Sequence, residues 1–596
     1  MPGQGDRGGI KEKPKNTKGT LLRILRYLLE FKWSILLLFL CSVLCNIGNL
    51  LGPKFAGRAI GVAEEGYQKG IGMIDMDKVL YYTILMLIIY VGSNLLTFIV
   101  SIRMSRIAKK IASNMRRDVF EKLMKLPVSY FDRNQAGDII SRVSYDIDVV
   151  STSLSTDVIQ ILTSLITVVG SFVIMCTISM PLVLCMIFTI PASILFTKRM
   201  SRKTRPLYSK RSQAYGVMNG FTEEMFTGQK TILAYAREND ISDRFREVNM
   251  AAATAYKNAD GLGMTMGPTI GMISNFGLAA IGMGGAILYL YKIVGLEQIS
   301  SFVLYSRKFS GPINEISNII NEILSALAAS ERVFSLIDQP EEAPDADNAE
   351  ELTDCRGEVA ASGISFGYLK DKTVLHNLNF RAESGQTIAI VGPTGAGKTT
   401  IINLLMRFYD VNDGKIYVDD KEYREYTRKS LRKNYAMVLQ DTWLFQGSIY
   451  DNIAYGKEGA TREEVVNAAK AAKIHNYIMT LPKGYNTIIY EDGGNISKGQ
   501  KQLLTIARAM LYNTNMLILD EATSNVDTNT EIEVQKAIKR LMKGKTNFVI
   551  AHRLSTIRNA DTILVVNNGD VIEQGNPDEL MSRHGFYYNL YASQFS

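Results

Sequence analysis

The sequence contains few residues of the kind that mark disulfide-stabilised or secreted proteins. It has only five cysteines in 596 residues. Four lie inside apolar runs and the last stands alone in a polar segment: Cys41, Cys45, Cys176, Cys185 and Cys355. We interpret them as small buried hydrophobic side chains, so no disulfide framework is expected. Residues 1–30 are basic and polar, without an apolar core or cleavage site, and predict no cleaved signal peptide.

Acidic residues are also in the minority, since the sequence has 67 Lys and Arg but only 59 Asp and Glu, which gives a net charge of +8. A basic chain can bind nucleic acid, but here the basic residues crowd the N-terminal segment 1–33 and the segments that join apolar runs. That is where membrane proteins carry positive charge on the cytosolic side. We therefore predict a lipid bilayer as partner and no nucleic acid.

Long apolar runs divide the chain into unlike halves. They cover 34–53, 80–101, 155–178, 181–198 and 261–291, and a spanning helix needs about 20 apolar residues. Four runs satisfy that length and 181–198 is borderline. A sixth segment, 298–325, contains Arg307, Lys308, Glu315 and Glu322 and by itself fits an amphipathic cytosolic helix equally well. We count this segment as a span, because the N-terminal segment and the domain after 328 must lie on the same side of the membrane. That requires an even number of spans.

The sequence thus predicts six transmembrane helices over 34–327, with the long loops 102–154 and 198–260 in the cytosol because both are rich in Lys and Arg. Met, Phe and Gly positions of the fifth run either line a greasy substrate path or simply pack helices. The residues in question are Met264, Met266, Met272, Phe276 and Met283.

An acidic, proline-containing linker over 328–352 leads into a soluble domain at 353–596. There, apolar strands such as Thr387–Val391, 516–519 and 548–551 alternate with helical stretches such as 400–407 and 502–511. This alternation predicts a mainly parallel α/β sheet.

A glycine-rich loop follows the first of these strands and opens a helix, which is the context that a P-loop requires. Its backbone N–H groups wrap phosphates, Lys398 neutralises the β/γ charge, and the Thr399 hydroxyl is placed for Mg²⁺. The predicted nucleotide-binding residues of this loop are Gly392, Pro393, Thr394, Gly395, Ala396, Gly397, Lys398, Thr399 and Thr400.

A second element is the apolar strand that ends in Asp520 and Glu521. Asp520 is placed to hold Mg²⁺ through water, and Glu521 to polarise the attacking water as a general base. An apolar run ending in two acids is common, but in combination with the upstream P-loop it indicates an ATPase.

With these motifs the chain resembles exporter-type ABC transporters from about residue 18 to its end. The resemblance implies roles for further residues: Tyr368 stacks on adenine, Gln440 links Mg²⁺ and water to the membrane domain, and His552 contacts the γ-phosphate. Ser524 to Asp527 resemble the D-loop. It also implies two short cytosolic helices that seat the membrane domain on the ATPase domains, near 128–132 and 222–227.

The signature loop departs from the family pattern. Where Leu-Ser-Gly-Gly-Gln is usual, this chain has Ile496, Ser497, Lys498, Gly499 and Gln500. By resemblance, Ser497, Gly499 and Gln500 contact the nucleotide of the partner subunit. Lys498 replaces a glycine that lets the backbone approach phosphate. A degraded signature beside intact catalytic residues resembles the catalytic-glutamate-bearing subunit of heterodimeric bacterial multidrug exporters. The partner is then expected to carry an intact signature and a replaced Walker B glutamate, whereas a homodimer that tolerates Lys498 is the alternative.

The expected activity is ATP hydrolysis coupled to alternating access in the plasma membrane, with the N-terminus and ATPase domain cytosolic. An ABC importer is disfavoured by the fused domain order, and a soluble ATPase machine by the uncharged run 261–291. A membrane protein that uses ATP as a gating ligand with little turnover is disfavoured by Glu521. The substrate stays open among drugs, lipids and peptides, so multidrug or amphiphile efflux is an expectation by analogy.

Overall fold

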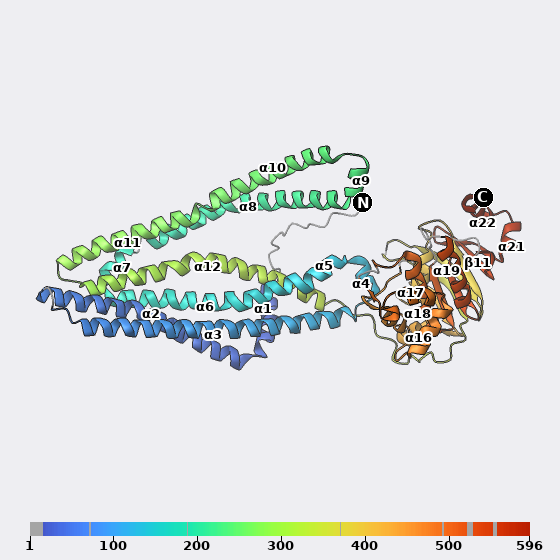
Figure 1. The fold of residues 1–596 in the computed structure, drawn as a ribbon, viewed down its shortest axis with the longest axis horizontal. Coiled ribbons are helices and arrows are strands. Elements are labelled where there is room, and N and C mark those ends of the chain that lie inside the picture. Colours follow the sequence, from blue (N-terminus) through green and yellow to red (C-terminus); the bar gives the residue numbers. More distant parts are fainter. Residues whose placement is uncertain are drawn as a thin grey trace. The chain divides into compact units, whose positions relative to one another are not determined.

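The computed structural model describes residues 16–70, 73–186, 189–369, 371–440, 442–490, 494–520, 528–551 and 557–595. Contacts within the chain separate two compact units: Met1–Leu126 with Asn134–Pro340, and Pro127–Arg133 with Glu341–Ser596. Figure 1 shows that the first unit consists of long helices and the second mixes helices with strands. The short helix α4 (Val128–Arg133) belongs to the second unit by contact, although the chain on both sides of it belongs to the first.

The first unit is helical. Its helices are α1 (Thr17–Leu29), α2 (Lys32–Lys69), α3 (Met76–Leu123), α5 (Ala136–Ser141), the π-helical turn η1 (Arg142–Asp146), α6 (Ile147–Ile178), α7 (Met180–Met186), α8 (Thr189–Thr227), α9 (Gln229–Ala234), α10 (Glu238–Gly263), α11 (Met266–Leu290) and α12 (Leu296–Ile337). The predicted apolar runs lie on α2, α3, α6, α7, α8, α11 and α12 among these helices. The start of α3 is set by Asp75, whose carboxylate accepts a hydrogen bond from the Lys78 N–H at 3.1 Å.

Within the described residues, four helical stretches are long and apolar enough to cross a membrane: Lys32–Lys69, Met76–Leu123, Ala136–Ile178 and Glu238–Leu290. Apolar side chains on the outside of these helices, such as Leu37, Leu40 and Leu87, are exposed in the single chain, as a lipid-facing surface requires. The predicted spans at 181–198 and 298–325 lie on α7, α8 and α12, which are not among the four. The count of six spans therefore stays a prediction.

Helices α2, α3, α6 and α12 lie side by side and form the bundle of the first unit (Figure 1). Close approach of α2 and α12 depends on Gly57, where an added Cβ would lie 1.9 Å from the Ser301 Oγ atom. Nearer the other end of the bundle, η1 presents the buried Asp146 to α12. Its two oxygens accept hydrogen bonds from Arg332 at 2.6 and 2.9 Å, so a bidentate ion pair joins η1 to α12.

The second unit contains two main sheets and a small two-stranded pair. Its strands are β1 (Val359–Phe366), β2 (Leu375–Ala382), β3 (Thr387–Val391), β4 (Asp413–Val418), β5 (Lys421–Glu422), β6 (Tyr435–Val438), β7 (Gly447–Ser448), β8 (Ile488–Ile489), β9 (Met516–Asp520), β10 (Thr546–Ile550), β11 (Thr562–Asn567) and β12 (Asp570–Gly575). Its helices after α4 are α13 (Lys398–Leu405), η2 (Tyr423–Glu425), α14 (Arg428–Lys433), α15 (Ile449–Ala454), α16 (Arg462–Ala471), α17 (His475–Thr480), η3 (Gly484–Asn486), α18 (Lys498–Tyr512), α19 (Thr528–Met542), α21 (Pro577–Ser582) and α22 (Phe586–Phe595).

The larger sheet has the order β12-β11-β3-β10-β9-β6, and its pairs are parallel except β11 with β12. Every residue of β3 and β10 is buried, which explains why these strands appear in the sequence as unbroken apolar runs. The smaller antiparallel sheet β2-β1-β4-β5 was not predicted, because β2 and β4 mix buried with exposed residues and form no unbroken apolar run.

Two predicted boundaries fall differently in the structure. The second short cytosolic helix was expected at 222–227, but these residues form the last turns of α8, and the separate short helix is α9. The first expected short helix, near 128–132, coincides with α4. Helix α12 continues to Ile337, inside the range predicted as linker, and the contacts change from one unit to the other after Pro340.

Candidate functional site

The predicted P-loop lies between β3 and α13, and its glycines adopt backbone conformations that side chains rarely allow. The φ angles of Gly395 and Gly397 are +84° and +105°. A Cβ on Gly392 would lie 2.1 Å from the Val566 carbonyl oxygen, whereas one on Gly395 would meet nothing within 4 Å. The loop is therefore closely packed at its start and open at its middle, as a cradle for phosphate requires.

Lys398 begins α13 and folds back over this loop. Its Nζ donates to the carbonyl oxygens of Gly392 at 2.7 Å and Pro393 at 3.0 Å, and its side chain is buried. Burial lowers the pKa of Lys398, and the negative charge of Asp520 opposes that shift. A cation held across the loop by two carbonyls suits the β/γ-phosphates of ATP.

The remaining P-loop residues divide into exposed and buried positions. Thr394, Gly395 and Thr399 are exposed, so their polar groups are open to a ligand. Ala396, Gly397 and Thr400 are buried and fix the loop against the domain. These residues fit the predicted nucleotide, with the Thr399 hydroxyl available to Mg²⁺, which supplies charge neutralisation between phosphates when it is bound.

The order of the larger sheet gathers the predicted catalytic positions at one edge. Strands β3, β10, β9 and β6 are adjacent and parallel, and Asp520 at the end of β9 is paired in register with Ile550 at the end of β10. Gln440 lies two residues after the end of β6 and is exposed. Because the carboxyl ends of parallel strands share one edge, the P-loop, Asp520 and Gln440 lie along it. Three of the predicted features lie outside the described residues: Glu521, the D-loop at 524–527 and His552.

Tyr368 is linked directly to the P-loop helix. Its hydroxyl donates to the Thr400 Oγ1 atom at 3.2 Å and accepts from the Asn403 side-chain amide at 3.2 Å. Its ring packs edge-on against Tyr409, with centroids 4.9 Å apart. The predicted adenine-stacking residue is thus positioned beside α13 by contacts that no local sequence pattern indicated.

Helix α4 contacts the same aromatic cluster. Arg133 donates to the Tyr368 carbonyl oxygen at 3.1 Å, and the Tyr409 hydroxyl donates to the Asp132 carboxylate. Burial and this carboxylate both raise the pKa of Tyr409. Sequence reasoning placed a short helix here, but it did not find Tyr409, because 277 residues separate it from Asp132.

The signature residues form the start of α18. Ser497 is its N-cap: the Gln500 N–H donates to the Ser497 Oγ atom at 3.4 Å, and the Ser497 N–H donates to the Gln500 Oε1 atom at 3.1 Å. Gly499 is buried, while Ser497 and Lys498 are exposed. Among described residues, no hydrogen bond joins this turn to the P-loop of the same chain.

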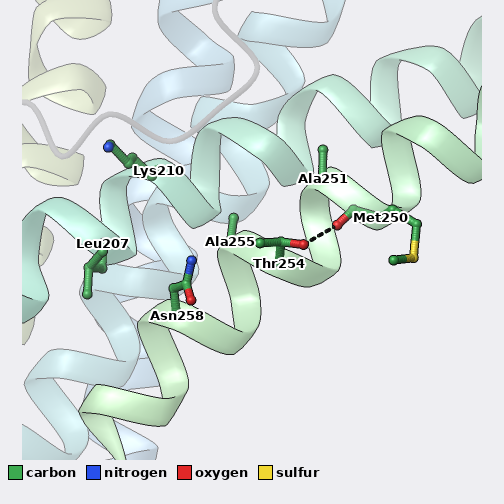
Figure 2. Close-up of a pocket in the computed structure, with 7 residues that line it drawn as sticks. All are labelled: Leu207, Lys210, Met250, Ala251, Thr254, Ala255 and Asn258. Carbon is green, nitrogen blue, oxygen red and sulfur yellow. Dashed lines mark hydrogen bonds between the residues drawn. The ribbon is translucent and has the colours of Figure 1, made fainter.

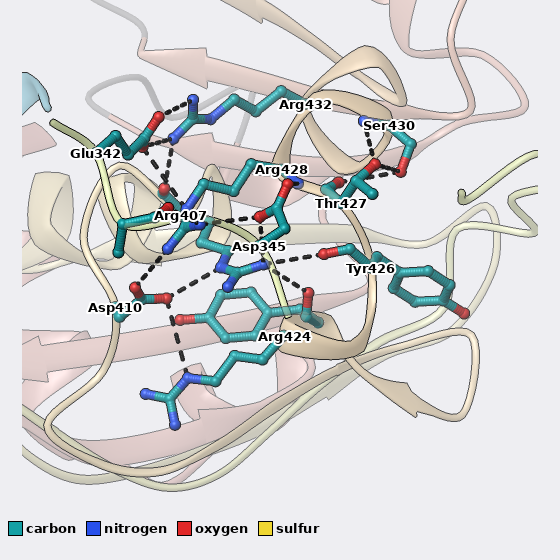
Figure 3. Close-up of polar contacts among 12 residues, drawn as sticks. Glu342, Asp345, Arg407, Asp410, Arg424, Tyr426, Thr427, Arg428, Ser430 and Arg432 are labelled. Carbon is teal, nitrogen blue, oxygen red and sulfur yellow. Dashed lines mark hydrogen bonds and ion pairs between the residues drawn. The ribbon is translucent and has the colours of Figure 1, made fainter. Parts of the chain in front are cut away.

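A cluster of ion pairs, which we call the linker cluster, holds residues 342–345 of the linker on the ATPase unit (Figure 3). Its members are Glu342, Asp345, Arg407, Asp410, Arg428 and Arg432. Arg407 and Arg428 are buried, and Arg407 follows the C-terminal end of α13. The linker is thus bound next to the helix that begins at the P-loop.

In the first unit, a groove between α8 and α10 has a volume of about 420 Å³ and is lined by Leu207, Lys210, Met250, Ala251, Thr254, Ala255 and Asn258 (Figure 2). It contains none of the predicted ATP residues and none of the methionines considered for a substrate path. Of those, Met264, Met272 and Met283 are exposed in the single chain.

The comparisons identify both units by family. Residues 35–313 match the family described as ABC transporter transmembrane region, and residues 375–524 match that described as ABC transporter. A solved structure titled as a bacterial Atm1-family ABC exporter with ATP bound is 28% identical, with a TM-score of 0.75 over 96% of this chain and 99% of that chain.

Relatives of similar length carry several names. The ABC transporter ATP-binding protein YfiC of Bacillus subtilis is 42% identical over 585 residues, which are 98% of this chain and 96% of that protein. A fatty acid ABC transporter ATP-binding/permease protein of Mycobacterium bovis is 40% identical over 87% of this chain and 82% of its own length. An ATP-dependent lipid A-core flippase of Syntrophus aciditrophicus is 34% identical over 85% and 84%.

Proposed function

The chain is an ABC exporter half-transporter, and from this premise we propose that it exports lipid-like amphiphiles across the plasma membrane, driven by ATP and Mg²⁺. Its membership in the family confirms the predicted helical membrane domain, the α/β P-loop domain and ATP hydrolysis coupled to transport. The single observation that carries the proposal is the fusion of a bilayer-spanning helical domain to a P-loop ATPase.

The relatives support amphiphiles as substrate class. One is named for fatty acids and another for lipid A-core, and both names describe molecules with an apolar part and a polar part. An alternating-access exporter serves such substrates because the apolar part enters from the bilayer while the polar part needs a protein environment.

In the proposed cycle, Lys398 and the P-loop amides bind the phosphates, and Tyr368 stacks on adenine. Thr399 and Gln440 would hold Mg²⁺ directly, and Asp520 would hold it through water. Glu521 acts as the general base, and His552 contacts the γ-phosphate. The contacts of Arg133 and Asp132 with Tyr368 and Tyr409 support α4 as the element through which nucleotide binding reaches the membrane helices.

We further propose a heterodimer. Lys498 is the first residue of α18 and is exposed, so its charge stands at the positive end of the helix dipole. A side chain of that length also occupies the space where a glycine admits phosphate. A partner with an intact signature would complete the site at Lys398 and Glu521, and its own site, facing Lys498, would tolerate a replaced glutamate.

The test compares ATPase rates of this chain alone, of the chain with the product of its neighbouring gene, and of the pair with Glu521→Gln. We expect activity only from the pair, and a loss of at least about 100-fold with Glu521→Gln, which is the lower range for removing a general base. Full activity from the chain alone would mean that Lys498 is tolerated and that a homodimer is sufficient.

A further inference from the structure

One face of α12 donates a row of hydrogen bonds to the backbone of α2. The Ser301 hydroxyl donates to the Pro53 carbonyl oxygen at 3.2 Å, and the Tyr305 hydroxyl donates to the Leu50 carbonyl oxygen at 2.5 Å. Lys308 continues the row, and its Nζ donates to the Asn49 carbonyl oxygen. These contacts fall where Pro53 interrupts the hydrogen-bond ladder of α2.

The proline explains why Asn49 needs an outside donor. In an α-helix the Asn49 carbonyl would accept from the N–H of the residue four positions later, which is Pro53 and has no N–H. An unpaired carbonyl in a membrane helix is costly, so a donor from α12 stabilises the bundle. A neutral donor is sufficient for this purpose, as Ser301 and Tyr305 demonstrate on the same face. The positive charge of Lys308 is therefore not explained by the helix contact.

The charge lies deep in the predicted bilayer. Lys308 is 12 residues after Leu296, the first residue of α12, which is about 18 Å along the helix axis. Its neighbours are Asn49 and the ring of Tyr90, 5.4 Å from the Nζ atom, and both belong to apolar runs of α2 and α3 that can span a membrane. A lysine at this depth marks a functional site unless a partner neutralises it.

The part of the chain that the structure describes contains no carboxylate paired with Lys308. The contacts found for its Nζ atom are a neutral carbonyl and an aromatic face. Lys308 is only partly buried, so its side chain keeps an open side. An anion supplied from outside the chain would complete the site.

We infer that Lys308 is a specificity-determining residue that binds the anionic headgroup of the transported amphiphile. The inference rests on the proposed amphiphile export and adds the substrate class, molecules with a carboxylate or phosphate on an apolar chain. Asn49 and Tyr90 hold the ammonium group at the depth of the apolar chain, while the anion takes the hydrogen-bonding positions that they leave free.

The test uses proteoliposomes that contain the purified transporter, and measures ATP-dependent movement of two probes in the same preparation. The probes are a fluorescent fatty acid and its methyl ester, which share the apolar chain and differ in charge. The wild type is expected to prefer the acid by about tenfold, the equivalent of one charge-assisted contact.

Lys308→Gln keeps an N–H donor for Asn49 and removes the charge, so the preference should fall to near one. Lys308→Arg should restore it. Ser301→Ala is the matched control, because it removes a neighbouring α12 to α2 hydrogen bond without changing charge, and should leave the preference and basal ATPase rate unchanged. Because the readout is a ratio, a difference in the amount of folded transporter does not affect it.

An unchanged preference in Lys308→Gln, or an equal loss in Ser301→Ala, would overturn the assignment while leaving amphiphile export intact. A wild-type transporter that hydrolyses ATP but moves neither probe would refute the proposed export itself, and the assignment with it.

Discussion

Replacing Arg428 with methionine should loosen the linker from the ATPase unit. The Arg428 guanidinium donates to the Asp345 and Asp410 carboxylates, each at 2.9 Å, and to the Ala343 carbonyl oxygen at 2.7 Å (Figure 3). Its side chain is only 8% exposed. Methionine preserves most of the apolar stem, so the change removes mainly the three hydrogen bonds.

The size of the expected stability loss depends on the hydrogen bonds that each carboxylate retains in Arg428→Met. Asp345 retains the backbone N–H of residue 428 at 3.1 Å, and Asp410 retains Arg407 Nε at 3.0 Å. Neither carboxylate is left without a donor, and Asp410 is 40% exposed, so water compensates part of the loss. Of the roughly 1.5–3 kcal/mol typical for a hydrogen bond to a charged group, we expect a total loss of about 2 kcal/mol. For a unit of this size that corresponds to a fall in midpoint temperature of about 4–8 °C.

Cys355 allows the measurement to report on the ATPase unit alone. Burial raises the pKa of this thiol to about 12, so it reacts slowly with maleimides until the unit unfolds. In a background where Cys41, Cys45, Cys176 and Cys185 are alanine, the midpoint of maleimide labelling against temperature is compared for the wild type and Arg428→Met.

Lys421→Met is the matched control. Lys421 also fastens the linker, through Glu350 at 2.6 Å, but both side chains are largely exposed, at 46% and 66%. An exposed pair of this kind contributes little, so its removal should not change the midpoint measurably. Equal midpoints for Arg428→Met and the wild type would refute the reasoning that the buried cluster, rather than chain connectivity, holds the linker.

Two further predictions concern the P-loop and pH. Gly392→Ala would place a methyl group 2.1 Å from the Val566 carbonyl oxygen, and overpacking of this kind costs about 1–3 kcal/mol. We expect MgATP affinity, measured by nucleotide titration, to fall at least about tenfold. An affinity equal to that of the wild type would contradict the packing argument. Burial alone would raise the pKa of Asp410, but Arg407 and Arg428 outweigh it and hold that pKa below its ordinary value of 3.8. A carboxyl with a lowered pKa stabilises the folded state above that ordinary value and loses its contribution as pH falls through the lowered value. Circular dichroism during heating compares the stability of the wild type with that of Asp410→Asn. The difference in stability should therefore be present at pH 7 and shrink with acidification below pH 3.8. A difference that does not depend on pH would contradict the proposed role of the ion pairs.

The sequence by itself determined those elements of this protein that depend only on residues close together in the chain. The P-loop was readable because a strand, a glycine-rich turn and a helix start follow one another directly, and the positive φ of Gly395 and Gly397 requires those residue types. The buried strands β3 and β9 and the spans within α2 and α3 were readable because their apolar runs match the length of the element.

Only the tertiary structure decided which distant residues meet. It brought Asp132 to Tyr409, Lys308 to Asn49 and Arg428 to Asp345, pairs separated by 277, 259 and 83 residues. No periodicity or spacing encodes such contacts, since each depends on how whole helices and strands pack. Charged and hydroxyl side chains look alike in sequence whether they face solvent or a buried partner, and the difference arises when packing removes water from around them.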